Sequence, residues 1–387
     1  MPVLIITFLI FLIYLIYESI THNRRINSIP LRICVTGTRG KTGVTRLIAC
    51  ILRENGNKVF AKTTGSQAAI ILPDSSDIPV KRYGIPSIIE QKKLINRAVK
   101  ENADCIVSEI MSIQPENHYV ESDKILKPNI VIITNTRKDH TETMGSTEEK
   151  ISSVLSLCIT EKAKVFIPEN ENREIFAQTV KKMGGELIRV SSGASSNIPG
   201  LKSGVFSENL NIVCKVSEYL NVDKDVIIKG IKNVKYDIGE FRIWKYRPPE
   251  NGKTIYLVNA FAANDPESTY RIILKTKEIL QTDSDNFTGI LNLRADRGDR
   301  TLQWIETLKN GRFECLKRIY AVGAHSRIVK RKAERIIVPD KKSPEYLMNT
   351  VISDSNDNDV VFGFGNMKGM GEVLVKYWKS IGEEHGL

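Results

Sequence analysis

The sequence has few cysteines and no close pair of them. No two of the six form a CxxC pair, so the chain lacks the usual motif of a zinc ribbon or a redox dithiol. Several fall inside apolar, strand-like runs, and we interpret all six as reduced core residues of a cytosolic domain. They are Cys34, Cys50, Cys105, Cys158, Cys214 and Cys315. Internal repeats and low-complexity segments are also lacking, which argues against a repeat architecture.

The beginning of the chain lacks charge. Residues 3–17 carry no charged side chain and are almost wholly Leu, Ile, Phe, Val and Tyr. As a helix, fifteen to twenty such residues span roughly 25 to 30 Å, the low end for a bilayer. No basic residue precedes the run and bulky residues follow it, which disfavours a cleaved signal peptide. The run has no polar face, which disfavours a buried amphipathic helix. We predict a transmembrane helix at 1–20 and a linker at 21–30.

Basic residues outnumber acidic ones, giving a formal net charge of +11. Arg24 and Arg25 follow the apolar run, so the positive-inside rule predicts a single-pass membrane protein with its bulk in the cytoplasm. The remaining charge is spread along the chain, in runs such as 317–332 with few interleaved aromatics. A solvated basic surface is the default interpretation, and an acidic polymer or a nucleotide is the functional alternative. We expect no nucleic-acid partner.

Apolar runs and helical stretches alternate through the remaining residues, which is typical of parallel βαβ units. With 387 residues and 41% hydrophobic content, the chain can bury at least two cores. The pattern breaks near residues 236–239 and then restarts. We therefore predict an α/β protein with a parallel-sheet central domain at 31–237 and a smaller α/β domain at 238–387. Strand-like runs lie at 31–35, 58–61, 104–109, 129–135, 163–168, 186–191, 254–262, 288–294, 318–323 and 359–365.

A glycine-containing loop follows the first of these runs and directly precedes an apolar-faced helix. Its residues are Gly37, Thr38, Arg39, Gly40, Lys41 and Thr42. Such a loop offers backbone N–H groups and a helix N-terminus to phosphate. By the chemistry of P-loops, Lys41 reaches the β- and γ-phosphate oxygens and the Thr42 hydroxyl holds Mg²⁺. The loop is shorter than the full GxxxxGK[ST] pattern, because the position five before Gly40 is Val35.

Polar residues end three further runs, at the edge where parallel sheets bind ligands. Thr64 follows the run at 58–61, which we place beside the first strand. Glu109 ends the next run, and His140 follows the run at 129–135. We predict one Mg²⁺ on Thr42 and Glu109, with Thr64 as a weaker ligand, and a second metal or substrate contact at His140. Lys41, Glu109 and His140 are the predicted catalytic residues.

Three ordered motifs carry a family resemblance. GTRGKT at 37–42, SEIMSIQPE at 108–116 and TNTRKDHTE at 134–142 resemble the central domain of the Mur ligase and folylpolyglutamate synthase superfamily. The resemblance continues in 206–220, 259–269 and 292–300. Together with the apolar N-terminus, the segment at 362–372 resembles the membrane subunit of poly-γ-glutamate synthases.

The resemblance implies an ATP- and Mg²⁺-dependent ligase that joins glutamate through a γ-carboxyl acyl phosphate. Its partners would be glutamate, an anionic poly-γ-glutamate chain and other membrane subunits of a synthase or export complex. Closure of the C-terminal domain would bring four further residues to ATP, namely Asn264, Asp265, Arg297 and Arg300. The resemblance leaves open whether the glutamate is D or L and whether the polymer is a capsule or is released.

The chain departs from the superfamily at two positions. Mur ligases often place a carbamoylated lysine about 14 residues after the metal-binding histidine, whereas this chain has Val154 there and Lys150 too early. The domain-junction Gly-Arg pair is replaced by Gly239-Glu240-Phe241-Arg242. The glycines at 363–371 would suit a dinucleotide fold, but the segment lies too near the C-terminus for a full βαβ unit, and we favour a tight turn at a domain or subunit interface.

Two alternative functions remain open. A folylpolyglutamate-type or cell-wall precursor ligase shares the chemistry, but the substrate-recognition domain of Mur enzymes is missing before the phosphate loop, and a folate ligase needs no membrane helix. A regulatory membrane NTPase of an export system would need only the helix and the loop, and it predicts ATP hydrolysis without glutamate dependence.

Overall fold

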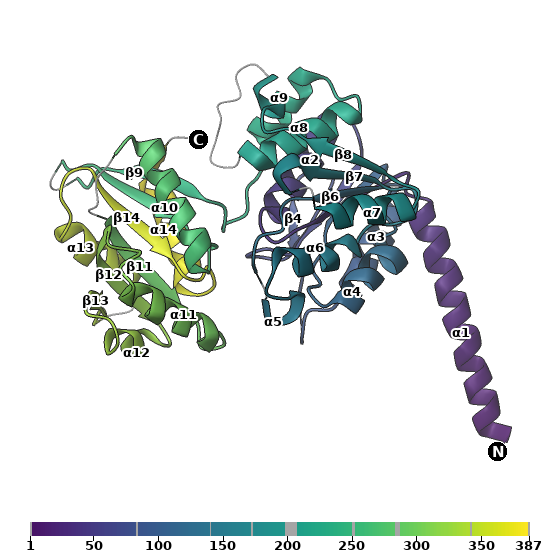
Figure 1. Cartoon of the computed structure of the whole chain (residues 1–387), viewed down its shortest axis with the longest axis horizontal. Coiled ribbons are helices and arrows are strands. Elements are labelled where there is room, and N and C mark those ends of the chain that lie inside the picture. The colour runs from purple at the N-terminus through teal and green to yellow at the C-terminus, as the bar shows by residue number, and fades with distance from the viewer. Residues whose placement is uncertain are drawn as a thin grey trace. The chain divides into compact units, whose positions relative to one another are not determined.

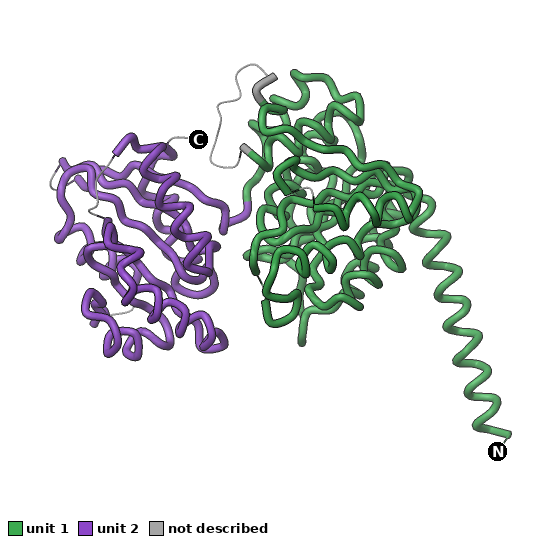
Figure 2. The backbone as a smooth tube through the Cα atoms, viewed as in Figure 1, with its two compact units in different colours: residues 1–236 green, residues 237–387 purple. Residues whose placement is uncertain are grey.

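The alternation of apolar runs and amphipathic helices produces two mostly parallel sheets, which confirms the predicted α/β class. The computed structural model describes residues 2–82, 84–139, 141–171, 173–197, 207–249, 252–282, 287–340 and 343–385. The chain folds into two units, residues 1–236 (unit 1) and 237–387 (unit 2) (Figure 2). Each unit has its own sheet.

The sheet of unit 1 has eight strands in the order β4-β3-β2-β5-β1-β6-β7-β8. Six run parallel, and at one edge β3 pairs antiparallel with both β2 and β4. The strands are β1 (Leu31–Thr36), β2 (Val59–Thr63), β3 (Ala69–Ile71), β4 (Asp77–Pro79), β5 (Cys105–Glu109), β6 (Ile130–Ile133), β7 (Lys164–Pro168) and β8 (Glu186–Val190). The edge hairpin β3–β4 was not predicted from the sequence, because its strands have only three residues each.

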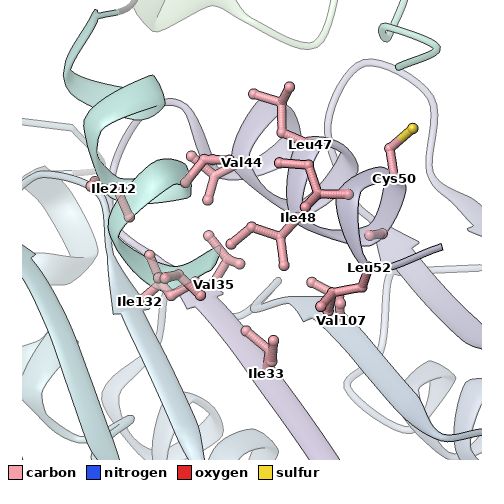
Figure 3. Packing of buried hydrophobic residues seen from close by; sticks show 14 of the residues in the cluster. Ile33, Val35, Val44, Leu47, Ile48, Cys50, Leu52, Val107, Ile132 and Ile212 are labelled. Carbon is pink, nitrogen blue, oxygen red and sulfur yellow. The ribbon is translucent and has the colours of Figure 1, made fainter. Parts of the chain in front are cut away.

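Helices cover both faces of this sheet, because the central strands are apolar on both sides. One face carries α2 (Lys41–Glu54), α8 (Ser207–Tyr219) and α9 (Lys224–Asn233). In Figure 3, Val44 and Ile48 of α2 face Ile33 and Val35 of β1. Burying each such side chain contributes roughly 1.5–3 kcal/mol.

The opposite face carries α3 (Glu90–Lys100), the π-helix η1 (Val120–Leu126), α6 (Glu148–Ser156) and α7 (Glu174–Lys182). Short helical turns complete unit 1: α4 (Pro115–Tyr119), α5 (Thr141–Met144), η2 (Glu169–Glu171) and η3 (Ala194–Asn197). Helix α3 begins at Glu90, beyond Pro86, which disfavours helical backbone at Ile85.

The N-terminal helix α1 (Pro2–Asn27) projects from unit 1 (Figure 1). It is long and apolar enough to cross a membrane, and its residues from Val3 to Ile16 are all exposed. Residues 21–27, expected as a linker, continue the helix. They do so because His22 and Ile26 are buried, with the His22 ring 2.9 Å from the Ile125 carbonyl oxygen of η1.

Unit 2 has a seven-stranded sheet in the order β13-β12-β11-β14-β10-β9-β15. The strands are β9 (Arg242–Tyr246), β10 (Ile255–Asn259), β11 (Phe287–Leu293), β12 (Leu316–Gly323), β13 (Ile336–Ile337), β14 (Asp359–Phe364) and β15 (Glu383–Glu384). Strands β10 to β14 pair in parallel, and β9 and β15 pair antiparallel. The helices are α10 (Pro266–Leu280), α11 (Gly298–Lys309), α12 (Ser326–Lys330), α13 (Pro344–Ser353) and α14 (Met370–Ile381).

Candidate active site

Three strand ends meet at the centre of the unit 1 sheet. Strand β1 lies between β5 and β6 and runs parallel to both. The residues that follow these strands therefore share one edge, where open parallel sheets bind ligands. The loop 37–40 follows β1, Glu109 ends β5, and Asn135 lies two residues beyond β6.

Asn135 fixes the conformation of the phosphate loop. Its Oδ1 accepts a hydrogen bond from the Thr38 hydroxyl at 2.6 Å and one from the Arg39 N–H at 3.2 Å. Its Nδ2 donates to the Arg39 carbonyl oxygen at 2.9 Å. Gly37 has a φ of 125°, and a Cβ there would lie 2.1 Å from the Thr134 hydroxyl oxygen, so the close approach of the two segments requires glycine.

Lys41 begins α2 and folds back over the loop. Its Nζ donates to the Gly37 carbonyl oxygen at 2.7 Å. Burial lowers the pKa of Lys41, while the negative charges of Glu109 and Asp139 act in the opposite direction. The ammonium group is thus held at the N-terminus of α2, where the helix dipole also favours an anionic ligand.

Glu109 joins the beginning of α2 to the end of β2. One carboxylate oxygen accepts the Thr42 hydroxyl at 2.9 Å and the Thr64 N–H at 2.7 Å. The structure thus brings Thr42, Glu109 and Thr64 together, although Thr64 contacts the carboxylate through its backbone. Strand β2 lies beside β5 rather than β1, so the predicted strand neighbour was wrong. Strand β5 fits between them because Cys105, Ile106 and Val107 place buried apolar side chains on both of its faces.

A divalent metal fits the oxygen atoms of Thr42 and Glu109. Mg²⁺ prefers oxygen ligands and usually keeps several waters and substrate phosphates, so it needs few protein ligands. Within the ranges that the structure describes, no group of three His, Cys, Asp or Glu side chains could hold a metal alone. This set suits a metal that binds together with a nucleotide.

His140, the predicted second metal contact, lies outside the described residues. Its neighbour Asp139 is buried and forms an ion pair with Arg39, with 3.3 Å between Oδ2 and the guanidinium nitrogen. Val154, at the position of the superfamily lysine, is 8% exposed and packs in the apolar core of unit 1. It therefore provides no ligand.

The four predicted ATP-binding residues of unit 2 follow strands on either side of β14. Asn264 and Asp265 come after β10, and Asp265 caps α10 by accepting the Ser268 N–H at 2.8 Å. Arg297 and Arg300 come after β11, at the beginning of α11. Because β10, β14 and β11 are parallel neighbours, these residues lie along one edge of their own sheet. Their role in ATP binding stays a prediction. Arg242, the altered junction residue, pairs with Glu384 of β15.

Two buried polar residues beside the loop, His118 and Glu121, were not predicted from the sequence. His118 lines a small cavity with Gly37, Lys41 and Ser112. Its ring nitrogens lie 3.0 Å from the Ser112 carbonyl oxygen and 3.3 Å from the Thr36 hydroxyl, and burial lowers its pKa to about 4. Glu121 of η1 is fully buried nearby. Neither belongs to a recognisable motif, so no signal in one sequence could have found them.

The loop, the strand-end glutamate and the two α/β units define a class of ligase. The Mur ligase middle domain matches residues 35–235. The poly-gamma-glutamate synthase CapB C-terminal domain matches residues 244–381. The chain therefore belongs to the Mur ligase family of ATP-dependent amide ligases, and within it to the CapB poly-gamma-glutamate synthases.

Relatives and solved structures agree with this assignment. The chain is 33% identical to the PGA synthase CapB of Bacillus subtilis, over 97% of each chain. It is 28% identical to the capsule biosynthesis protein CapB of Bacillus anthracis, over 93% of this chain and 79% of that protein. The fold is similar to that of a bifunctional folylpolyglutamate synthase/dihydrofolate synthase from Yersinia pestis, solved with AMPPNP and a Mn ion. That match has a TM-score of 0.70 at 14% identity and covers 93% of this chain and 92% of that one.

Proposed function

We propose that this protein polymerises glutamate through its γ-carboxyl group at the expense of ATP, making poly-γ-glutamate. The observation that carries the proposal is the meeting of the phosphate loop with the Thr42–Glu109 pair, in a chain similar along 97% of its length to a protein named PGA synthase. The roles of the individual residues in the two chemical steps belong to the same proposal.

In the first step, a γ-carboxylate oxygen of glutamate or of the growing chain attacks the γ-phosphorus of ATP. An acyl phosphate forms and ADP leaves. The backbone N–H groups of the loop bind the phosphates, and Lys41 moves from the Gly37 carbonyl oxygen to the β- and γ-phosphate oxygens. Thr42 and Glu109 would hold one Mg²⁺ ion, with Thr64 as a weaker candidate ligand, and His140 would hold a second ion or contact substrate. Ions held there would neutralise charge on ATP and on the carboxylate.

In the second step, the amine of glutamate attacks the acyl carbon, the amide forms and phosphate leaves. Basic side chains stabilise the tetrahedral intermediate, whose oxygen is negatively charged. The reaction needs no Ser or Cys nucleophile, because the carboxylate itself is activated. The protein therefore acts by positioning its substrates and by electrostatics.

The membrane location belongs to the same proposal. Helix α1 crosses the bilayer once, and Arg24 and Arg25 keep the two units in the cytoplasm, where ATP is available. Other membrane subunits of a synthase or export complex then receive the polymer. The exposure of every residue from Val3 to Ile16 supports an apolar partner for this helix.

The test uses the full-length protein in detergent micelles. ATP-dependent phosphate release is measured with L-glutamate, with D-glutamate and with neither, and products are identified by mass spectrometry. We expect glutamate-stimulated release with a γ-linked product, reduced at least about 100-fold by Lys41→Ala. Lys229→Ala is the control, because Lys229 is 64% exposed and pairs with Glu54 at 2.8 Å, at the far end of α2.

Two outcomes would count against the proposal. Glutamate-independent ATP turnover that survives His140→Ala favours a regulatory membrane NTPase. Glutamate addition to a folate or a cell-wall precursor, without homopolymer, favours the related ligases.

A further inference from the structure

Glu121 is a carboxyl group with no exposure to solvent, and it lies on a rare element. It belongs to η1, a seven-residue π-helix that begins directly after α4. Such helices are uncommon and occur frequently at functional sites. A buried carboxylate contributes little to stability compared with a well-packed apolar side chain, so its presence calls for a second explanation.

The hydrogen bonds of Glu121 converge on the turn that follows Glu109. Its two carboxylate oxygens accept the Met111 N–H at 3.1 and 3.2 Å. One of them also accepts the Ser112 N–H at 2.9 Å and the Ser112 hydroxyl at 2.6 Å. A carboxylate accepts such bonds without donating any, so it suits a cluster of N–H and O–H groups.

Gln91 extends the network to Glu109 itself. Its Nε2 donates to the Glu121 carboxylate at 2.6 Å and to the Glu109 carbonyl oxygen at 3.1 Å. Its Oε1 accepts the Ser108 hydroxyl at 2.8 Å. Ser108 before Glu109 and the turn 110–112 after it are therefore hydrogen-bonded to the same buried pair, the Gln91 amide and the Glu121 carboxylate.

We infer that Glu121, with Gln91, is a positioning residue that holds the Glu109 carboxylate against Thr42 for the metal–nucleotide complex. This inference rests on the proposed function for the role of Glu109, although its test does not need ligation. In Glu121→Gln, the new NH₂ group faces the N–H and O–H donors of Met111 and Ser112. The turn 110–112 therefore shifts, and the Glu109 carboxylate moves away from Thr42. Outer contacts of this kind typically change metal affinity or activity by about 10- to 100-fold.

The experiment compares Glu121→Gln with Ser122→Ala in the full-length protein. Ser122 is the adjacent buried residue of η1, and its hydroxyl donates to the Cys158 carbonyl oxygen at 2.7 Å, away from the turn. Binding of Mn²⁺ with a non-hydrolysable ATP analogue is measured by electron paramagnetic resonance, and stability by thermal unfolding. We expect Glu121→Gln to weaken Mn²⁺ binding at least about 10-fold. Ser122→Ala should lower the melting temperature without this loss.

Equal Mn²⁺ affinity in Glu121→Gln and Ser122→Ala overturns the inference. So does a loss of Mn²⁺ affinity that is proportional to the loss of melting temperature in both variants. If Glu121→Gln fails to fold, Gln91→Met decides, because it removes the bonds to Glu121 and to the Glu109 carbonyl oxygen while keeping the volume. It should weaken Mn²⁺ binding about 3- to 10-fold, and wild-type affinity would refute the inference. If the wild-type protein binds Mn²⁺ and nucleotide but does not ligate glutamate, the proposed function is wrong and the inference about Glu121 is unaffected.

Discussion

Each unit contains a strand, a glycine-containing loop and a helix, but the two loops differ in what surrounds them. In unit 1, β1 leads through Gly37 to α2, and Asn135 beside β6 holds the loop. In unit 2, β14 leads through Gly365 to α14, and Asn292 of β11 holds the loop. Both glycines have positive φ, 125° and 101°. Similar backbone constraints therefore recur in two places.

The difference lies in the side chains that follow each glycine. The helix of unit 1 begins with Lys41 and Thr42, and Thr42 meets the Glu109 carboxylate. In unit 2, the carbonyl oxygens of the loop bond to the neighbouring strand: Asn292 of β11 donates to those of Asn366 and Lys368 at 2.6 and 3.0 Å. Asn366 returns a bond to the Asn292 carbonyl oxygen at 3.2 Å. A glycine pattern thus predicts a backbone conformation, and only the neighbouring polar side chains indicate a ligand.

Alanine at the two glycines should give the largest contrast. Gly37→Ala places a Cβ 2.1 Å from the Thr134 hydroxyl oxygen, and Gly365→Ala places one 2.6 Å from the Asn292 carbonyl oxygen. Each costs roughly 1–3 kcal/mol of stability for the backbone conformation alone. Gly37→Ala should also reduce ATP-dependent ligation by more than about 100-fold, whereas folded Gly365→Ala should stay within about 3-fold of wild type.

Ligation rates are measured per folded protein, with the folded fraction taken from circular dichroism. The contrast fails if Gly365→Ala loses as much activity as Gly37→Ala. In that case the second loop would also serve the reaction.

Replacing each of the two asparagines with alanine should give a smaller difference between the loops. Asn135→Ala removes the bonds to Thr38 and Arg39, and Asn292→Ala removes those to Asn366 and Lys368. Each leaves buried groups unpaired, at a cost of about 1–3 kcal/mol in unfolding free energy. Only Asn135→Ala should raise the KM for ATP, by about 10-fold, since about 1.4 kcal/mol of lost binding corresponds to that factor. An unchanged KM would mean that the loop keeps its shape without Asn135.

The sequence predicted what local patterns determine. The loop 37–42 and the α/β class follow from spacing and periodicity, and both are local properties. Strand order is not local, which is why β2 was placed beside β1 although β5 lies between them. The hairpin β3–β4 was missed because strands of three residues carry too little periodicity.

The supporting residues of the site could not be predicted. Glu121 is 12 positions beyond Glu109 and Gln91 is 18 before it, and only the packing of α3 and η1 on one sheet face brings the three together. Asn135 is the last residue of the predicted run at 129–135, but its three side-chain bonds to the loop depend on β6 being the neighbour of β1. Sequence motifs identify the side chains that contact ligands more readily than they identify the residues that position those side chains.

The smallest of the predicted effects is acid sensitivity. As pH falls, unit 1 should lose folding stability at a higher pH than unit 2. Burial lowers the pKa of His118 to about 4 and also lowers that of His22. An unfolded histidine titrates near 6.5, so as pH falls the unfolded state binds the proton first. Stability is therefore complete above about pH 6.5 and declines toward pH 4. His118 alone accounts for a loss of about 2 kcal/mol between pH 7 and pH 5.

All three tryptophans, Trp244, Trp304 and Trp378, lie in unit 2, so their fluorescence reports the unfolding of that unit. Hydrogen exchange measured by mass spectrometry reports unit 1 peptide by peptide. We expect exchange in β1 and α4 to accelerate between pH 7 and pH 5, after correction for the intrinsic rate, while the tryptophan transition moves less. His118→Gln keeps a polar side chain that does not titrate, so it should remove most of the acid dependence in unit 1. An unchanged pH dependence in this variant would assign the acid sensitivity to His22 or to the carboxylates instead.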